Sequence, residues 1–333
     1  MFALCSDITI GKFDLVKPIS VKINKSVYEY ADRAIIKIPI TARIILDGQV
    51  ITESAETAKK FDEGDNVLIK LGYNGNLKNE FEGFISRINF SSPLEIECEG
   101  FSYQLRKKTY LKTFSNTELK SVLEYLIQGT GIKLDSDIPS FKIEKLILKN
   151  NNGIEAIEKI KKISDNNLKI FFTGNLLYAG LEYLNLKADV KYRLGWNVIK
   201  DGNLKKREAK NLNITVHYIG ENKDGSKEVV KSMHNKTVEL SSIPGETIKI
   251  TTHAIRDKNT LKGMADSKLK SLSFDGYEGK ITAFGTPYCE PGYRAILEDN
   301  KFGERSGKYF VESIEVNYSQ AGFRRQVGIG AKL

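Results

Sequence analysis

The hydrophobic pattern of the chain changes its period twice, and this change constrains the fold more than any other feature. Up to about residue 110, short runs of β-branched and aromatic residues are bounded by Gly, Asn, Asp or Pro. Such runs are typical of β-strands. We therefore predict that residues 1–110 form an antiparallel sheet that curls into a first barrel-like domain. The predicted strands cover 21–23, 34–40, 67–71, 81–88 and 94–98.

Residues 111–187 show a helical period. A capping-box pattern at 115–118 precedes an apolar stripe that starts at Leu119, and Gly129 follows it as a stop signal. A second helix is predicted at about 153–165, where Asn152 and Glu155 are the capping residues. Short apolar runs at 141–148 and 168–172 favour strands, so this region is predicted to be a small α+β domain.

From residue 188 to residue 333 the strand period returns. One helix is predicted inside this region at about 258–272, with Asp257 as its N-cap. The fold class that follows is mainly β with α+β: two antiparallel β-barrel-like domains flank the small α+β domain. The strands predicted here cover 212–218, 238–240, 247–252, 279–285, 293–297, 309–318 and 323–329.

The two β regions repeat a spacing. A glycine opens a strand, and an aromatic residue begins the return strand 17 positions later, at Gly64 and Phe81 and again at Gly292 and Tyr309. The match is either a coincidence between common hairpins or the trace of two related barrels in one chain. In the second case, three chains would present six similar units around an axis.

The charge and cysteine content narrow the class of protein. Lys and Arg number 51 against 42 Asp and Glu, so the net charge of +9 is small beside a mixed charged surface. The basic clusters at 159–162, 205–207 and 324–325 have no aromatic series, so we expect no sequence-specific binding of nucleic acid. Three distant cysteines without CxxC spacing indicate a reducing compartment. No apolar stretch is long enough to predict membrane insertion.

No catalytic, cofactor-binding or metal-binding pattern is present. The three histidines lack HExxH or HxH spacing, and Gly72–Asn76 is a hairpin turn without a phosphate-loop pattern. A glycosidase pair of Glu97 and Glu99 is conceivable, but acidic residues two apart are common on solvated strands. We therefore expect no catalytic residues, no cofactor and no metal.

Several segments together resemble the late control protein D family, the baseplate hub proteins of contractile phage tails. Related modules form the N-terminal part of type VI secretion spike proteins and occur in extracellular contractile injection systems. No single motif is specific, but the order and spacing of the segments are. They are 61–73, 81–85, 97–100, 112–119, 279–287, 290–292 and 307–314.

The resemblance implies a homotrimer whose two barrels per chain form a pseudo-sixfold ring in the tail baseplate. Such a hub is assembled in the bacterial cytoplasm and joins the hexameric tail tube protein to a trimeric central spike protein, beside other baseplate proteins. The sequence ends at Leu333, soon after the second barrel, so we expect the spike to be a separate polypeptide. A hub of a tailocin or an extracellular injection system, and a peptidoglycan-degrading tail enzyme, stay open as alternatives. A carbohydrate-binding adhesin is disfavoured by the single tryptophan, Trp196.

Contacts between subunits are predicted from the need to cover the edges of a sheet. The side chains predicted for the subunit interface lie on four strands. They are Val67, Ile69, Leu71, Phe81, Ile85, Ile296, Tyr309 and Val311. Contacts to the spike are predicted on the lysine-rich second helix, through Lys159, Lys161 and Lys162.

Overall fold

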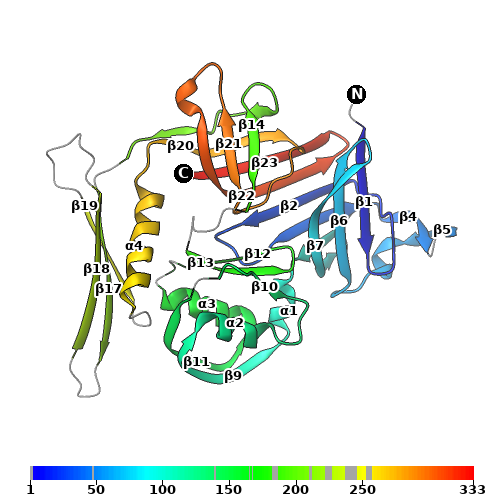
Figure 1. Ribbon diagram of the computed structural model, residues 1–333. Coiled ribbons are helices and arrows are strands. Elements are labelled where there is room, and N and C mark those ends of the chain that lie inside the picture. Colours follow the sequence, from blue (N-terminus) through cyan, green and yellow to red (C-terminus); the bar gives the residue numbers. More distant parts are fainter. Residues whose placement is uncertain are drawn as a thin grey trace.

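The computed structural model describes residues 3–46, 49–138, 140–164, 166, 168–181, 187–209, 212–221, 227–236, 246–252 and 257–333. In these residues the protein is mainly β, with an α+β region between two sheet regions, which confirms the predicted fold class (Figure 1). No helix within the described ranges is both long and apolar enough to cross a membrane.

The first sheet region, unit one, has antiparallel strands in the order β1-β6-β7-β8-β3-β2. Alternation explains them: in β3, Ala34, Ile36 and Ile38 are buried, and the residues between them are more exposed. The elements are β1 (Leu4–Ile10), β2 (Ser20–Ser26), β3 (Arg33–Ile38), β6 (Asn66–Tyr73), β7 (Asn76–Asn89) and β8 (Leu94–Glu99). Before β6 come the hairpin β4 (Thr41–Leu46) and β5 (Gln49–Glu56), and the 3-10 helix η1 (Thr57–Lys60).

The middle region combines short helices with two small sheets. β9 pairs with β11, and β10 and β12 flank β13. The apolar faces of α2 and α3 are buried in a core that they share with these strands. The elements are α1 (Ser102–Arg106), β9 (Thr109–Glu118), α2 (Leu119–Ile127), β10 (Lys133–Leu134), β11 (Lys142–Asn152), α3 (Gly153–Ile163), β12 (Leu168–Thr173) and β13 (Leu176–Leu181).

The capping box predicted at 115–118 is wrong, because these residues form the end of β9. Glu118 is the N-cap of α2, but its side chain makes no capping hydrogen bond. Its carboxylate instead accepts from the Phe141 backbone N–H at 3.0 Å and from Ser140 Oγ at 3.1 Å. Residues 115–118 therefore form a strand because they pair with β11, although their local sequence pattern favours a helix cap.

The capping box predicted for the second helix is confirmed. Asn152 Oδ1 accepts from the Glu155 backbone N–H at 2.9 Å, and Glu155 Oε2 accepts from the Asn152 backbone N–H at 3.2 Å. Two backbone donors at the start of α3 are thus satisfied reciprocally.

Replacing Asn152 by alanine should lower the free energy of unfolding by about 1 kcal/mol, because the start of α3 loses its cap. Urea unfolding followed by circular dichroism measures this change. Asn259→Ala is the matched control, since Asn259 is exposed in the first turn of α4 (Lys258–Leu272). The control should change stability by less than about 0.5 kcal/mol. Equal effects of both substitutions would contradict a capping role for Asn152.

The second sheet region, unit two, has the strand order β14-β21-β22-β23-β20-β15, and β16 also pairs with β20. Its elements are β14 (Asp189–Arg193), β15 (Val198–Lys200), β16 (Lys205–Arg207), β20 (Gly276–Phe284), β21 (Arg294–Glu298), η2 (Gly303–Arg305), β22 (Gly307–Ser319) and β23 (Gly322–Lys332).

An insertion between β16 and β20 shares a hydrophobic core with the middle region, and its helix α4 also contacts β23 of unit two. It holds β17 (Leu212–Glu221), β18 (Lys227–Lys236), β19 (Glu246–Thr252) and α4, whose predicted bounds and Asp257 cap are confirmed. Leu261, Met264 and Leu269 of α4 are buried in the same core as α2 and α3. Contacts thus cross the predicted boundary at 187–188, and the three domain ranges stay a prediction. The strand predicted at 238–240 lies outside the described residues.

The two units share one topology. Unit one uses β1, β2, β3, β6, β7 and β8 in sequence order, and unit two uses β14, β15, β20, β21, β22 and β23. In both sheets the first strand is followed by the fourth, fifth, sixth, third and second. One difference is that β1 runs antiparallel to β6, whereas β14 runs parallel to β21. The chain therefore contains the same strand order twice.

The turn that opens the repeated hairpin is the same in both units. Gly64 and Gly292 adopt positive φ angles of 95° and 87°. Gly64 N–H donates to the carbonyl of Ile85 at 2.8 Å, and Gly292 N–H donates to the carbonyl of Val311 at 2.9 Å. Each glycine lies in a conformation that side chains disfavour, which explains its presence at both positions.

The return strands do not match at the aromatic residues. Phe81 pairs with Ile69, the fifth residue after Gly64, whereas Tyr309 pairs with Ala295, the third after Gly292. The segment from the opening glycine to the residue whose carbonyl accepts its N–H is thus two residues shorter in unit two, Gly292 to Val311, than in unit one, Gly64 to Ile85, so Ile85 corresponds to Val311. Both strands then carry a bulge directly after this residue. The equal spacing to the aromatics is a coincidence within a genuine repeat.

Candidate assembly interface

Unit one and unit two meet through one antiparallel strand pair. β2 pairs with the second half of β22, from Ser20 opposite Ser319 to Ser26 opposite Ser313. Figure 1 shows β2 beside β22 at the centre of the molecule. Within the described residues the two units therefore share a single 13-stranded sheet, and one hydrophobic core runs through both. We call this contact the β2–β22 joint.

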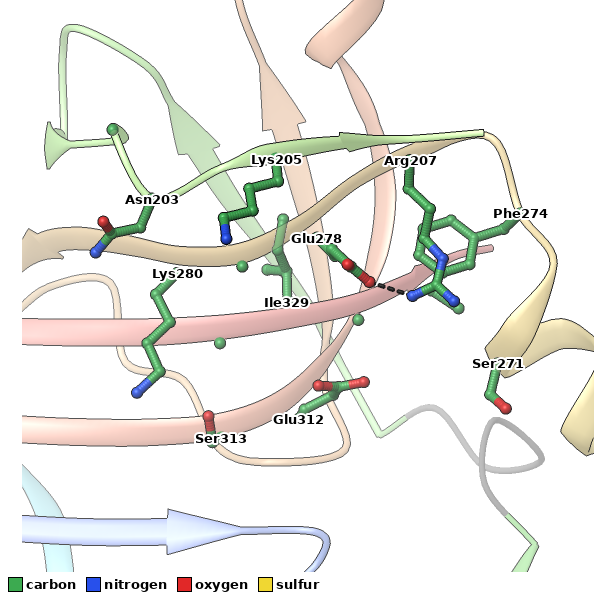
Figure 2. A pocket seen from close by; sticks show the side chains of 15 residues that line it. Asn203, Lys205, Arg207, Ser271, Phe274, Glu278, Lys280, Glu312, Ser313 and Ile329 are labelled. Atoms are coloured by element: carbon green, nitrogen blue, oxygen red, sulfur yellow. Dashed lines mark hydrogen bonds and ion pairs between the residues drawn. The ribbon is translucent and has the colours of Figure 1, made fainter. Parts of the chain in front are cut away.

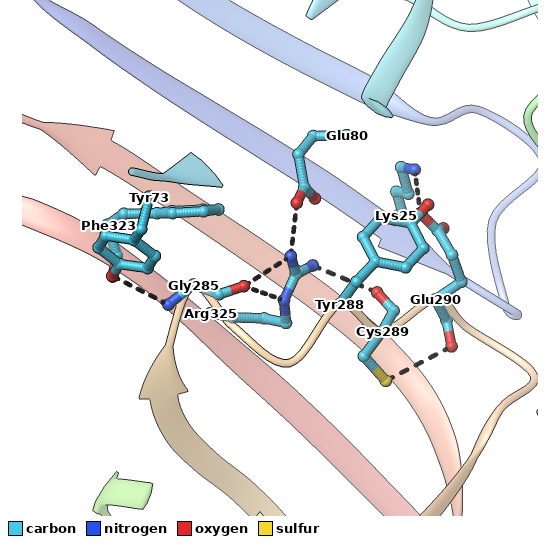
Figure 3. A network of polar contacts seen from close by, with 9 residues as sticks. All are labelled: Lys25, Tyr73, Glu80, Gly285, Tyr288, Cys289, Glu290, Phe323 and Arg325. Carbon is cyan, nitrogen blue, oxygen red and sulfur yellow. Dashed lines mark hydrogen bonds and ion pairs between the residues drawn. The ribbon is translucent and has the colours of Figure 1, made fainter. Parts of the chain in front are cut away.

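An ion pair is buried beside the joint. The guanidinium of Arg325, on β23, donates to Glu80 Oε1 on β7 at 2.6 Å, and both side chains are only 1% exposed. Arg325 also donates to the carbonyls of Gly285, at 3.0 and 3.2 Å, and Cys289, at 3.2 Å. Figure 3 shows the guanidinium surrounded by these acceptors. A buried ion pair with these additional acceptors links strands of different units in a directional geometry.

A second buried pair connects β2 with the loop between β20 and β21. Lys25 Nζ lies 2.7 Å from Glu290 Oε1, and Tyr288 also donates to this carboxylate. Burial alone would lower the pKa of Lys25, but the adjacent Glu290 and Asp32 raise it overall. Burial raises the pKa of Asp32 to about 7, and Lys25 counteracts part of that shift.

Neutral contacts complete the connection between the units. Tyr73 of β6 donates its hydroxyl to the carbonyl of Phe323 at 2.7 Å, and its ring packs against the Phe323 ring with centroids 5.5 Å apart. The same hydroxyl accepts from the Gly285 backbone N–H at 3.4 Å. Paired strands, buried ion pairs and packed rings thus all cross between the two units.

The side chains predicted for the subunit interface lie mostly inside the protein. Seven of them are buried in the shared core, at 2% exposure or less: Val67, Ile69, Leu71, Phe81, Ile85, Tyr309 and Val311. Ile296 is partly buried on β21, between β14 and β22. A subunit contact at these strands would use outward-facing neighbours or free backbone edges. The prediction that they form a subunit interface stays a prediction.

Two of the three lysines predicted to contact the spike already bond within the chain. Lys159 Nζ donates to Asn151 Oδ1 at 2.6 Å and to the Ile147 carbonyl at 3.0 Å. Lys161 Nζ donates to the Tyr28 carbonyl at 3.2 Å. Lys162 is exposed at the end of α3. The spike contact also stays a prediction, and Lys162 is the lysine best placed for it.

A groove of about 570 Å³ crosses the face of unit two near the end of α4. Figure 2 shows that Lys205, Lys280, Glu278 and Glu312 surround it. Arg207 forms an ion pair with Glu278, and its guanidinium lies over the Phe274 ring, 4.9 Å from the centroid. The groove therefore carries charges of both signs, and one of its cations is held by an internal pair.

The carboxylates considered for catalysis serve local structure. Glu99 accepts from Ser102 Oγ at 2.6 Å and from Arg106 Nε at 2.9 Å, so it bonds to side chains at both ends of α1. Glu97 accepts from Asn89 Nδ2 at 2.7 Å. The described part of the chain contains no group of three or more His, Cys, Asp or Glu side chains that could hold a metal ion. Of the three histidines, His234 has no described side chain and His253 lies outside the described residues.

The sequence interpretation missed Arg325, which it assigned with Arg324 to a solvated basic cluster. The alternation of β23 carries the missing signal. Phe323, Arg325 and Val327 fall on one face of the strand, and all three are buried. A charged residue on the apolar face of a strand indicates a buried partner. Its partner Glu80 lies far away in the sequence, so no local pattern identifies it.

Comparison with known proteins found similarity at the level of structure. No family model matches the sequence, and no curated protein matches it either. A tail protein from Neisseria meningitidis MC58 aligns with a TM-score of 0.64 and 12% identity, over 98% of this chain and 96% of that one. The 43 kDa tail protein of prophage MuSo2 from Shewanella oneidensis aligns with a TM-score of 0.62 and 12% identity, over 98% of both chains.

A third solved structure belongs to a secretion system. A component of the type VI secretion system of E. coli, described as structurally similar to tail proteins of bacteriophage T4, aligns with a TM-score of 0.58 and 9% identity. The alignment covers 98% of this chain and 76% of that one. The chain therefore has the fold of these tail and secretion proteins, which agrees with the resemblance found in the sequence.

Proposed function

We propose that this protein is a structural baseplate hub of a contractile tail. In this role three copies form a ring of six similar units, which adapts the hexameric tail tube to a trimeric central spike. The observation that carries the proposal is the repeated topology of unit one and unit two. The tail-protein fold of the chain supports the location in a tail baseplate.

The joint between the units suits this role. A ring that matches a sixfold partner with three chains needs two similar units at a fixed spacing in each chain. The β2–β22 joint and the buried pairs Arg325–Glu80 and Lys25–Glu290 hold the units at one spacing. Breaking either buried pair would leave an uncompensated charge, so both pairs favour one geometry over alternatives.

The partners follow from the two symmetries of such an adapter. The ring of six units would contact the tail tube protein, and features present three times would contact the spike and other baseplate proteins. The exposed end of α3 with Lys162 occurs once per chain and is therefore a candidate for the threefold side. A hydrolase is the weaker candidate, because Glu97 and Glu99 are engaged by Asn89, Ser102 and Arg106.

The molar mass in solution tests the proposal. Light scattering after gel filtration should give three times the 37.5 kDa mass of the chain. Isolated tail or injection particles should contain the protein in threefold stoichiometry at the baseplate. A protein that stays a single chain in solution and is absent from such particles would contradict the proposed function.

A further inference from the structure

We propose that copies of this chain join in the ring through the same sheet pairing that joins the two units within one chain. The edge formed by β15 and β16 of one copy pairs, antiparallel, with the end of β7 in the next copy. This inference rests on the proposed function, because it names the surfaces that close the proposed ring.

The β2–β22 joint is the template. Along one edge, the first part of β22 pairs with β21, from Gly307 to Phe310. Further along the same edge of β22, residues Ser313 to Ser319 pair with β2. Two strands therefore lie end to end along this edge of β22, the fifth strand of unit two. They are β21, the fourth strand of unit two, and β2, the second strand of unit one.

β7 is the fifth strand of unit one, and the corresponding position on it is vacant. β6 pairs with residues 76–84 of β7, and in the part of the chain that the structure describes no strand follows β6 along that edge. When Ile85 is matched with Val311, and the bulges after these residues with each other, Ile88 corresponds to Ile314 and Phe90 to Val316. Ile314 and Val316 are 3% and 1% exposed, whereas Ile88 is only partly buried and Phe90 is 79% exposed. The end of β7 therefore lacks the cover that β2 gives to β22.

The matching edge belongs to β15 and β16, which take the place of β2 in unit two. Both pair with β20, and among the described residues the opposite edge carries one isolated bridge, from Val198 of β15 to Leu194, and no second strand. Ile199 on β15 is 41% exposed and Trp196 just before it is 79% exposed, while Val21 of β2 is 1% exposed. Unpaired edges with exposed apolar side chains favour pairing with another chain.

The template also fixes the register. In the joint, Asn24 of β2 lies opposite Glu315 of β22. Lys205 corresponds to Asn24 in the repeat. Lys205 pairs with Glu278 of β20 and Asn24 pairs with Arg33 of β3, and these two partners occupy equivalent positions on the third strands. Asn89 takes the place of Glu315. Lys205 of one copy is therefore opposite Asn89 of the next.

The charges around this pair are complementary. The Asn89 amide donates to the carboxylates of Glu95, at 3.2 Å, and Glu97, at 2.7 Å. A lysine opposite Asn89 thus meets negative charge across the strands, which favours the pairing. Within the joint, Lys22 and Glu315 make the same kind of cross-strand contact at 3.4 Å.

Cysteine cross-linking tests the register. A variant with Asn89→Cys and Lys205→Cys, in a Cys5→Ser background, should form disulfides on mild oxidation, because opposite residues in a sheet lie within disulfide reach. A non-reducing denaturing gel should show linked species of two and three chains and none larger. The control pair Lys78→Cys and Lys205→Cys should stay unlinked, since Lys78 is exposed on the part of β7 that β6 already covers.

A second variant tests the surface without new cysteines. Phe90→Asp should weaken association at least about tenfold while the thermal midpoint of the single chain stays unchanged, because Phe90 is exposed in the chain. Light scattering over a concentration series measures this. A three-chain mass that Phe90→Asp leaves unchanged, with no cross-link at Asn89 and Lys205, overturns the β7 joint but not the ring. A single-chain mass at all concentrations and in particles overturns both.

Discussion

Replacing Arg325 by methionine should lower the free energy of unfolding by about 3–5 kcal/mol, the largest stability effect expected in this protein. The substitution leaves the carboxylate of Glu80 buried at 1% exposure without its partner at 2.6 Å. It also removes the donors to the carbonyls of Gly285 and Cys289. Since the free energy of unfolding of a typical domain is about 5–15 kcal/mol, this loss is a large share of the total.

Chemical denaturation with a tryptophan-fluorescence or circular-dichroism readout measures the effect, and two variants serve as controls. Arg193→Met breaks an exposed arginine–glutamate pair with Glu298 and should cost no more than about 1 kcal/mol. The double variant Arg325→Met with Glu80→Met removes both charges and should recover much of the lost stability. If the double variant is as unstable as Arg325→Met, the uncompensated charge of Glu80 is not the cause.

Most of the strands and two of the helix caps could be predicted from the sequence, because their signals are local. Alternation of apolar residues marks β3 and β23, and Asn152 with Glu155 marks the start of α3. The end of β9 was mispredicted because Glu118 bonds to the backbone of Phe141 instead of capping its own helix. Tertiary pairing overrode the local preference there.

The assembly surfaces were harder to predict, because an edge strand and an interior strand have similar local sequences. The apolar residues of β6 and β7 were assigned to a subunit interface, yet they fill the shared core. The strand that truly joins the units, β2, finds its partner almost 300 residues away, at Ser319 opposite Ser20. Such a pairing depends on the whole fold and leaves no local pattern.

Asp32 should make the protein less stable as pH rises from 5 to 8. Burial raises the pKa of its carboxyl from 3.8 to about 7 in the folded state, so the folded protein holds a proton that the unfolded chain has lost. A raised carboxyl pKa adds stability that is fully present below the unfolded value and is lost as pH rises through the folded value. Between pH 5 and 8 this corresponds to about 3 kcal/mol, since one pKa unit is about 1.4 kcal/mol.

Comparison with Asp32→Asn isolates this effect, because asparagine does not titrate while the other groups stay the same. The unfolding free energy of the natural protein, relative to that of Asp32→Asn, should fall by about 3 kcal/mol as pH rises from 5 to 8. Asp257→Asn is the matched control. The Thr260 hydroxyl and backbone N–H lower the pKa of Asp257, so it is ionised in both states over this range and its curve should run parallel to that of the natural protein. A parallel curve for Asp32→Asn would mean that Asp32 stays charged beside Lys25, and the joint would then hold an additional buried ion pair.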